Sequence, residues 1–218
     1  MDVVTELAFQ GPKRGADRAV LLAHGAGADM NAATLTAFAD ALVNATSPVP
    51  VMRFNFPYRS AGRRAPDRPA VLAAATREAA GELARRTGLP PERLVLGGRS
   101  MGGRYASLAV GDADDPLPAL GLLLLGYPLH PAGRPEQLRV DHFPRLHVPV
   151  LFVSGTRDSL AEAGALRTHA KRIAGPVAFH WIETADHGFK PLKSSGSTQA
   201  TALAAAAVTV VDWVARLI

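Results

Sequence analysis

The pentapeptide Gly98-Arg99-Ser100-Met101-Gly102 constrains the fold of this chain more than any other feature. It follows an apolar run at residues 93–97 that is typical of a buried strand, and residues 103–110 are typical of a helix. Between a strand and a helix, the pattern G-x-S-x-G predicts a strained turn that projects the Ser100 hydroxyl past the sheet edge. The flanking glycines are expected because the turn brings the two backbones too close for a Cβ atom. The alternative is an ordinary glycine-rich turn.

Short apolar runs alternate along the chain with alanine-rich stretches of helical spacing. This alternation predicts an α/β fold, with a mostly parallel central sheet and helices on both faces. Strands are expected at residues 19–23, 50–56, 93–97, 119–125, 149–154 and 177–182. Helices are expected at residues 34–44, 71–87, 103–110, 161–173 and 198–217.

The remaining segments indicate how the chain is divided. Its 218 residues suit one core, and no linker interrupts them, so residues 1–218 are expected to form a single domain. Residues 112–118 and 127–148 are the least regular. The second segment is long enough for little more than a loop and a short helix, so no large lid domain is expected and the site should be open.

Composition and charge exclude several classes of partner. The chain has no cysteine, which rules out disulfides and thiolate sites, and its first residues lack the pattern of a secretory signal. A cytoplasmic protein is therefore expected. The net charge is +5, but the arginines are mixed with acidic residues and lack an aromatic RNA-binding pattern, so no nucleic-acid partner is expected. Residues 200–218 are apolar but alanine-rich and contain charges, which predicts a helix packed on the sheet and no membrane partner.

A serine hydroxyl becomes a useful nucleophile only beside a base, which is usually a histidine oriented by a carboxylate. In enzymes built on this strand–turn–helix unit, the acid and then the histidine follow the serine, each in a loop after a strand. Asp158 follows the strand expected at residues 149–154, and His187 follows the one expected at 177–182. Ser100, Asp158 and His187 are therefore the candidate nucleophile, orienting acid and base.

Each assignment has a structural alternative. Asp158 also suits the N-cap of the helix expected at residues 161–173. Asp186 is a poor substitute for Asp158 because its position next to His187 gives it the wrong direction to orient the ring. The histidines other than His187 and His24 lie in an expected strand, an expected helix or the irregular segment: His180, His169, His130, His142 and His147.

The reaction also needs N–H donors for a developing oxyanion. Met101, the residue after the nucleophile, is expected to supply one. The other is expected from the loop after the strand at residues 19–23, where His24-Gly25-Ala26-Gly27 resembles an HGGG-type oxyanion loop. Ala26 is the preferred donor and Gly25 the alternative. The structural alternative is that Gly25 and Gly27 only form a tight turn between the strand and the next helix, with no part in binding an oxyanion.

Other binding chemistry is weakly represented. The histidines lack zinc-ligand spacing, and no glycine-rich loop ends in Gly-Lys-Ser/Thr, so neither a metal nor a nucleotide cofactor is expected. Arg59 and Arg63 follow the strand at residues 50–56 and are candidates to attract an anionic substrate, although a solvated loop is the simpler explanation for them. Tyr127, after the strand at residues 119–125, is a third candidate for substrate contact.

Taken together, these motifs resemble those of small lidless α/β-hydrolases, such as dienelactone hydrolases and small carboxylesterases. The stretches Leu22–Met30, Arg53–Tyr58 and Gly97–Arg104 are especially similar to one subgroup. These are the bacterial hydrolases related to testis-expressed protein 30 and to the third subunit of the non-specific-lethal chromatin complex. The resemblance covers nearly the whole chain and implies the α/β-hydrolase fold.

The expected function is a serine hydrolase that cleaves a small carboxylic ester or thioester through an acyl-enzyme, without a cofactor. A C–C hydrolase or perhydrolase would use the same residues. Haloalkane dehalogenases and epoxide hydrolases need an aspartate where this chain has Ser100. The alternative from another class is a scaffold or binding protein on a hydrolase fold, a possibility kept open because eukaryotic members of the subgroup include candidate scaffolds.

Overall fold

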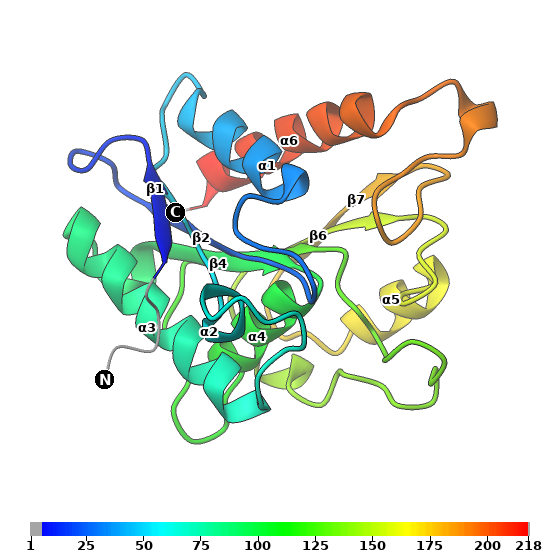
Figure 1. Cartoon of the computed structure of the whole chain (residues 1–218), viewed down its shortest axis with the longest axis horizontal. Coiled ribbons are helices and arrows are strands. Elements are labelled where there is room, and N and C mark those ends of the chain that lie inside the picture. Colours follow the sequence, from blue (N-terminus) through cyan, green and yellow to red (C-terminus); the bar gives the residue numbers. More distant parts are fainter. Residues whose placement is uncertain (1–5, 218) are drawn as a thin grey trace.

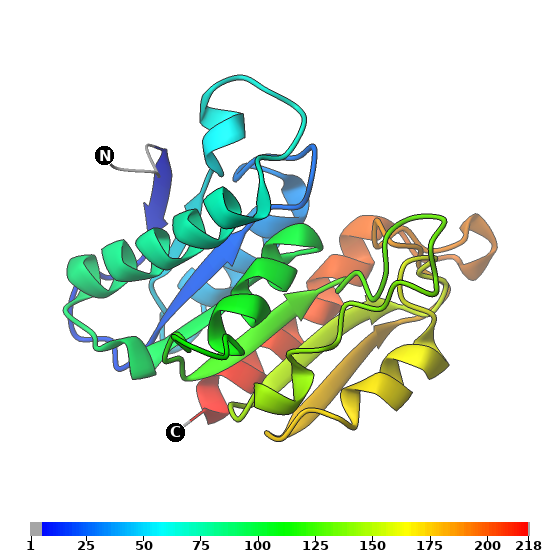
Figure 2. The ribbon, with the colours of Figure 1, turned by 90° about the horizontal axis from the view of Figure 1, so that it is seen from below.

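The computed structural model describes residues 6–217, which form a seven-stranded sheet with helices on both faces (Figures 1 and 2). The strand order is β1-β3-β2-β4-β5-β6-β7, and every neighbouring pair is parallel except β1 with β3. The strands are β1 (Leu7–Gln10), β2 (Ala19–Ala23), β3 (Val51–Phe54), β4 (Leu94–Arg99), β5 (Gly121–Leu125), β6 (Val150–Gly155) and β7 (Val177–Ile182). This is the α/β-hydrolase architecture expected from the sequence.

Five long helices cover the sheet in two layers. They are α1 (Ala33–Val43), α3 (Pro69–Thr87), α4 (Met101–Val110), α5 (Ala163–Ala170) and α6 (Gln199–Arg216). One buried apolar cluster lies between the sheet and α3, α4 and α5, and a second lies between the sheet and α1 and α6. Figure 2 views the molecule from the side of α3, α4 and α5. Two apolar layers explain why the central strands are buried on both faces.

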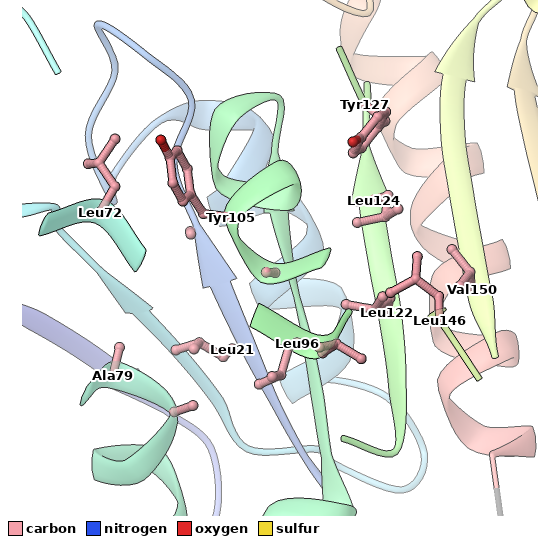
Figure 3. Packing of buried hydrophobic residues seen from close by; sticks show 14 of the residues in the cluster. Leu21, Leu72, Ala79, Leu96, Tyr105, Leu122, Leu124, Tyr127, Leu146 and Val150 are labelled. Carbon is pink, nitrogen blue, oxygen red and sulfur yellow. The ribbon is translucent and has the colours of Figure 1, made fainter. Parts of the chain in front are cut away.

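The first cluster includes residues from α4 and from both ends of β5. Figure 3 shows Tyr105 of α4, Leu122 and Leu124 of β5, and Tyr127 just beyond the strand. Leu122, Leu124 and Tyr127 are fully buried. Burial of a side chain of this size contributes about 1.5–3 kcal/mol each, so this packing fixes α4 firmly on the sheet.

Local signals set the helix ends. Gly88 ends α3 in a left-handed conformation with φ of 71°, as expected from the glycine that follows the helix. Thr198 begins α6 with a capping box, in which its side chain accepts from the Thr201 N–H. The helix α5 begins two residues later than expected because Glu162 is its N-cap and accepts hydrogen bonds from two N–H groups of the first turn.

Four short elements were not expected from the sequence: β1, α2 and the 3-10 helices η1 (Pro91–Arg93) and η3 (Lys193–Ser195). The strand β1 pairs antiparallel with β3 at the sheet edge, and the segment after β3 forms a short helix, α2 (Pro57–Ser60), rather than a loop. Between β5 and β6, residues 126–149 contain only one 3-10 helix, η2 (Phe143–Arg145), so no large lid domain is present there. No helix within residues 6–217 is long and apolar enough to cross a membrane.

Candidate active site

Ser100 lies at the point where β4 ends and α4 begins. Its backbone has φ of 50° and ψ of −111°, a conformation that costs energy for any residue with a Cβ. The Ser100 N–H donates to the Leu125 carbonyl oxygen at the end of β5, over 2.9 Å. The strained turn is therefore held by the neighbouring strand, which matches the sharp turn expected of the pentapeptide.

The glycines on either side of Ser100 are required by close backbone approach. A Cβ atom on Gly98 would lie 2.2 Å from the Ala23 carbonyl oxygen, and one on Gly102 would lie 2.3 Å from the same oxygen. Both distances are far shorter than any real carbon–oxygen contact, so a side chain at either position would push β4 or α4 away from β2. Gly98 also has φ of 152°, which favours glycine.

His187 lies between Ser100 and Asp158, within hydrogen-bond distance of each. The Ser100 Oγ is 3.1 Å from Nε2 of His187, and Nδ1 of His187 is 2.9 Å and 2.8 Å from the two Asp158 carboxylate oxygens. The Asp158 side chain is completely buried, whereas 25% of the His187 side chain is exposed. A buried carboxylate beside Nδ1 holds the ring proton there, so Nε2 is unprotonated and can accept a proton from the serine hydroxyl.

The loops that carry Asp158 and His187 are packed against each other. A Cβ on Gly155, at the end of β6, would lie 2.3 Å from the Ala185 carbonyl oxygen, and the Arg157 N–H donates to that oxygen over 2.9 Å. The Asp186 carboxylate accepts hydrogen bonds from the N–H groups of Gly188 and Lys190. Asp186 therefore stabilises the turn that presents His187 and does not itself orient the imidazole ring.

Asp158 does not cap α5. One of its carboxylate oxygens accepts from the Leu160 N–H over 2.8 Å, and the helix begins later, with Glu162 as its cap. The N-cap of α5, which was the alternative role expected for Asp158, is thus Glu162. Asp158 interacts instead with His187 and with its own loop.

The loop after β2 lies beside the nucleophile. A Cβ on Gly25 would lie 3.6 Å from the Ser100 Cβ and 3.4 Å from the Arg99 carbonyl oxygen, so this loop is in contact with the turn. Met101 is the first residue of α4, and its N–H has no intrahelical acceptor. Among the described residues, the Ala26 N–H donates no backbone hydrogen bond either. Both donors are available to a ligand.

His24, for which no separate role was predicted, is completely buried at the start of this loop. Its Nε2 accepts a hydrogen bond from the Phe56 N–H over 3.1 Å, and its ring packs edge-on against the Phe56 and Tyr58 rings. Burial lowers the pKa of His24, which keeps the ring neutral and able to accept. The signals in the sequence were its position directly after an apolar strand and its place at the start of the His24-Gly25-Ala26-Gly27 motif.

Arg99 is the second residue that sequence reasoning missed. Its guanidinium donates to the carbonyl oxygens of His187, Gly126 and Leu125, and it lies 4.7 Å from the centre of the Phe189 ring. The same group is 3.3 Å from Nε2 of His187. Burial lowers the pKa of Arg99 to about 10, so it stays charged at neutral pH. Arg99 thus joins the ends of β4 and β5 to the histidine loop.

The three candidate substrate contacts lie in different settings. Tyr127 is 0% exposed and its hydroxyl donates to the Arg139 carbonyl oxygen over 2.6 Å, so the expectation that it contacts substrate is not supported. Arg59 is 3.6 Å from an Asp29 carboxylate oxygen, and Arg63 is 2.5 Å from one of Asp67. Both arginines therefore have acidic partners.

His142 and His180 form hydrogen-bond contacts away from Ser100, Asp158 and His187. His142 is 3% exposed, and its Nε2 is 2.8 Å from the Ser107 Oγ on α4. His180 lies in β7, where its Nδ1 is 2.8 Å from the Thr209 Oγ1 on α6. The His142 ring thus connects the loop between β5 and β6 to α4, and the His180 ring connects β7 to α6. Neither ring is bonded to Ser100 or Asp158.

Comparisons with known proteins agree with this architecture. A family model described as "Alpha/beta hydrolase domain" matches residues 16–215. The structure is similar to that of a dienelactone hydrolase from Anabaena variabilis, with a TM-score of 0.71, 18% identity and coverage of 98% of this chain and 93% of that one. An alpha-beta serine hydrolase homologue from Coxiella burnetii has a TM-score of 0.71 and 18% identity over 94% of this chain and 89% of that one. A propionate-bound esterase from Thermogutta terrifontis has a TM-score of 0.65 and 18% identity, and the coverage is 94% and 88%. At these identities the likeness concerns the fold.

Proposed function

The chain belongs to the alpha/beta hydrolase family, and on this premise we propose that it is a serine hydrolase that cleaves a carboxylic ester or thioester. The observation that carries the proposal is the line of hydrogen-bond distances from the Ser100 Oγ through His187 to the buried Asp158 carboxylate. This combination supplies a nucleophile, a base and an orienting charge in the order that acyl transfer requires.

In the first half of the reaction, the Ser100 Oγ attacks the substrate carbonyl carbon while its proton passes to Nε2 of His187, 3.1 Å away. The imidazolium that forms is stabilised by the Asp158 carboxylate at Nδ1. When the tetrahedral intermediate collapses, the bond to the leaving alcohol or thiol breaks, and His187 gives it the proton. The acyl group stays on Ser100 as an ester.

In the second half, a water molecule takes the place of the departed alcohol or thiol. His187 accepts a proton from this water as it attacks the acyl carbon, and then returns a proton to the Ser100 Oγ as the acid leaves. In both halves we propose that the N–H groups of Met101 and Ala26 donate to the oxyanion, with Gly25 as the alternative to Ala26. Each such donor contributes about 3–4 kcal/mol to the transition state in enzymes where it has been removed.

The same proposal covers several finer points. Within the family, we propose that the chain belongs with the bacterial hydrolases related to testis-expressed protein 30 and to the third subunit of the non-specific-lethal complex. The stretches Leu22–Met30, Arg53–Tyr58 and Gly97–Arg104 support this placement. We also propose that residues 1–218 act as one domain in the cytoplasm, on small-molecule substrates. Arg59 and Arg63 stay predicted to attract anionic substrates, although Asp29 and Asp67 reduce the charge available to do so.

The decisive experiment is covalent labelling of the purified protein with a fluorophosphonate, together with a screen of esters and thioesters of different acyl length. We expect Ser100 to be labelled, and Ser100→Ala to lose labelling and at least about 10⁴-fold in kcat. The double variant Ser100→Ala/His187→Ala should be little worse than either single variant, because the residues act as one unit.

A scaffold or binding protein on the same fold would behave differently. It would give no labelling of Ser100 and no turnover of any ester or thioester, while the protein stayed folded. Full labelling of Ser100→Ala would show that another residue is the nucleophile. Either result would overturn the proposed function.

A further inference from the structure

Two buried polar side chains, Arg53 and Asn55, lie at the end of β3. Side chains of a strand alternate between its faces, so Arg53 is on the same face as Val51, which packs in the cluster beneath α1 and α6. Arg53 is 6% exposed and Asn55 is 7% exposed. Within residues 6–217, Arg53 forms no ion pair. A buried cation without a carboxylate costs desolvation energy, so its hydrogen-bond partners indicate what it does here.

Both side chains bind the backbone of one residue, Met30, in the loop between β2 and α1. The Arg53 guanidinium donates to the Met30 carbonyl oxygen over 2.5 Å. The Asn55 Oδ1 accepts a hydrogen bond from the Met30 N–H over 2.8 Å. Hydrogen bonds from a charged donor are among the stronger ones in proteins. The peptide groups on both sides of Met30 are therefore held by side chains from the end of β3.

Further hydrogen bonds restrict these two side chains themselves. Arg53 also donates to the Gln10 Oε1 in β1 over 3.0 Å, and Gln10 in turn donates to the Asp40 carboxylate of α1 over 3.0 Å. The Asn55 Nδ2 donates to the Glu6 carboxylate over 2.5 Å. A side chain whose rotamer is fixed by a second set of hydrogen bonds positions its own partner more precisely. The loop after β2 is thus connected through β3 to the edge strand and to α1.

The loop held in this way carries the proposed oxyanion donor Ala26. Between β2 and α1 the chain forms two successive turns, at residues 25–28 and 29–32. In each turn the last N–H donates to the first carbonyl oxygen, over 3.2 Å and 3.1 Å respectively. Ala26 lies in the first turn and Met30 in the second. The buried His24 ring fixes the chain just before the first turn, and the contacts of Met30 fix the second, so Ala26 is held from both sides.

We propose that Arg53 and Asn55 are positioning residues for the hydrolase reaction, a proposal that rests on the proposed function. By holding Met30 they set the place of the Ala26 N–H, and they touch no reacting atom themselves. The oxyanion develops only in the transition state, so a displaced donor weakens stabilisation of that state without weakening binding of the ester. Loss of either side chain should therefore lower kcat and leave KM nearly unchanged.

The test compares Arg53→Met and Asn55→Leu with the wild type, using a screened ester that the wild type cleaves and a trifluoromethyl ketone with the same acyl chain. The Ser100 Oγ adds to the ketone carbon and passes its proton to His187, which leaves a stable oxyanion at the donors. Each variant should lower kcat per folded molecule about 10²-fold, with less than about threefold change in KM. The inhibition constant of the ketone should rise by a similar factor.

The inhibition constant does not depend on the fraction of folded molecules. A variant that only unfolds more readily would therefore keep the wild-type value. A kcat per folded molecule and an inhibition constant within about threefold of the wild type, in both variants, would overturn the proposal.

A rescue variant tests the hydrogen bonds of Asn55 directly. Asn55→Asp keeps an acceptor for the Met30 N–H but places a carboxylate against that of Glu6, so kcat should fall about tenfold. Adding Glu6→Gln supplies an amide donor in the reverse direction and should recover most of that loss. A double variant that is no better than Asn55→Asp would overturn the role assigned to Asn55.

The matched control is Arg18→Met. Arg18 also donates to two backbone carbonyl oxygens, at the end of α6, but it precedes β2 and so lies at the opposite end of that strand from the loop. This variant should be less stable, with kcat per folded molecule and the inhibition constant unchanged. Equal effects of Arg18→Met and Arg53→Met on the inhibition constant would show that no specific position is set by Arg53, and would overturn the proposal.

Amide hydrogen exchange separates this proposal from the proposed function, because it needs no turnover. Exchange within residues 28–32, followed by mass spectrometry, should be at least about tenfold faster in Arg53→Met and Asn55→Leu than in the wild type, and unchanged in Arg18→Met. Faster exchange in a protein that is neither labelled at Ser100 nor active would overturn the hydrolase, and with it the catalytic consequence, while the hold on the loop would stand. An active, labelled wild type whose variants show unchanged exchange and unchanged inhibition constants would overturn the positioning role and leave the hydrolase in place.

Discussion

The Phe56 N–H donates a hydrogen bond to Nε2 of His24, and this contact joins the ends of β2 and β3 through a buried side chain. Because Nε2 accepts, the neutral ring carries its proton on Nδ1, which is 2.8 Å from the Gly25 carbonyl oxygen. The ring thereby fixes the residue that immediately precedes the proposed oxyanion donor Ala26.

His24→Ala should reduce catalysis without weakening substrate binding to the same extent. Loss of the ring frees the loop after β2, and a misplaced donor costs about 10²-fold in rate. We expect kcat to fall by roughly that factor while KM changes little, and the free energy of unfolding to fall by about 1–3 kcal/mol. Steady-state kinetics and urea unfolding measure the two effects.

The comparison variant is His24→Gln, whose side-chain oxygen can still accept from the Phe56 N–H. It should recover part of both the stability and kcat. If His24→Ala and His24→Gln lose kcat equally while their stabilities differ, the ring acts on the reaction by some route other than this hydrogen bond.

Gly102→Ala tests the close approach of α4 to β2. The added Cβ would lie 2.3 Å from the Ala23 carbonyl oxygen, so one of the two elements must move. Overpacking usually lowers the free energy of unfolding by about 1–3 kcal/mol. Because the clash here is with backbone, we expect a loss of about 3 kcal/mol or more, or failure to fold.

The matched control is Gly81→Ala in α3, where nothing lies within 4 Å of the added Cβ. Because alanine favours the helix over glycine, this variant should be more stable by up to about 1 kcal/mol. Equal stability changes in the two variants would show that contact with Ala23 does not determine the need for Gly102.

The positions of Ser100, Asp158 and His187 could be predicted because each depends on short-range pattern and chain order. A glycine-flanked serine after an apolar run, and an acid and a histidine each following a later run, place all three at the same edge of a parallel sheet. The contacts of Arg99 could not be predicted in this way. They depend on how the loop after β7 folds back over β4, which no local pattern specifies.

Tyr127 illustrates a second limit. The sequence places it correctly after β5, but Gly126 has φ of 59° and turns the chain, so the Tyr127 side chain lies in the buried cluster (Figure 3). There its ring packs against Phe143 and Phe152. Side-chain direction at a strand end depends on such single backbone angles. The edge strand β1 was also not predicted. Its four residues, Leu7–Gln10, show no clear alternation of apolar and polar side chains, and the strand is formed by pairing with β3.

Arg99→Lys should impair the reaction while retaining the positive charge. Lysine cannot replace the planar fork that donates to the carbonyl oxygens of His187, Gly126 and Leu125. The loop that carries His187 would then be less well fixed, and we expect kcat to fall at least about tenfold with little change in KM. The rate of fluorophosphonate labelling of Ser100 should fall in parallel.

Arg99→Met provides the comparison, since it removes both the charge and the fork. If geometry is what matters, Lys and Met variants should have similar kcat values. A Lys variant with wild-type kcat beside an impaired Met variant would instead assign the effect of Arg99 to its charge.

The last prediction concerns stability in acid. His142 is 3% exposed, and burial together with the charges of Arg104 and Arg145 lowers its pKa from the usual 6.5 to about 4. Between these two values the unfolded chain binds a proton that the folded protein does not, so stability decreases as pH falls from 6.5 to 4. Each pH unit corresponds to about 1.4 kcal/mol, which gives a loss of about 3 kcal/mol from this residue.

Urea unfolding of the wild type and of His142→Gln at pH 7 and pH 4 isolates this contribution. The stability advantage of the wild type over His142→Gln should shrink by about 3 kcal/mol between the two pH values. Ser107→Ala is the control: it removes the hydroxyl next to His142 but leaves the ring buried, so it should lower stability at both pH values and keep the pH dependence. A difference between wild type and His142→Gln that does not change with pH would contradict a buried, neutral His142.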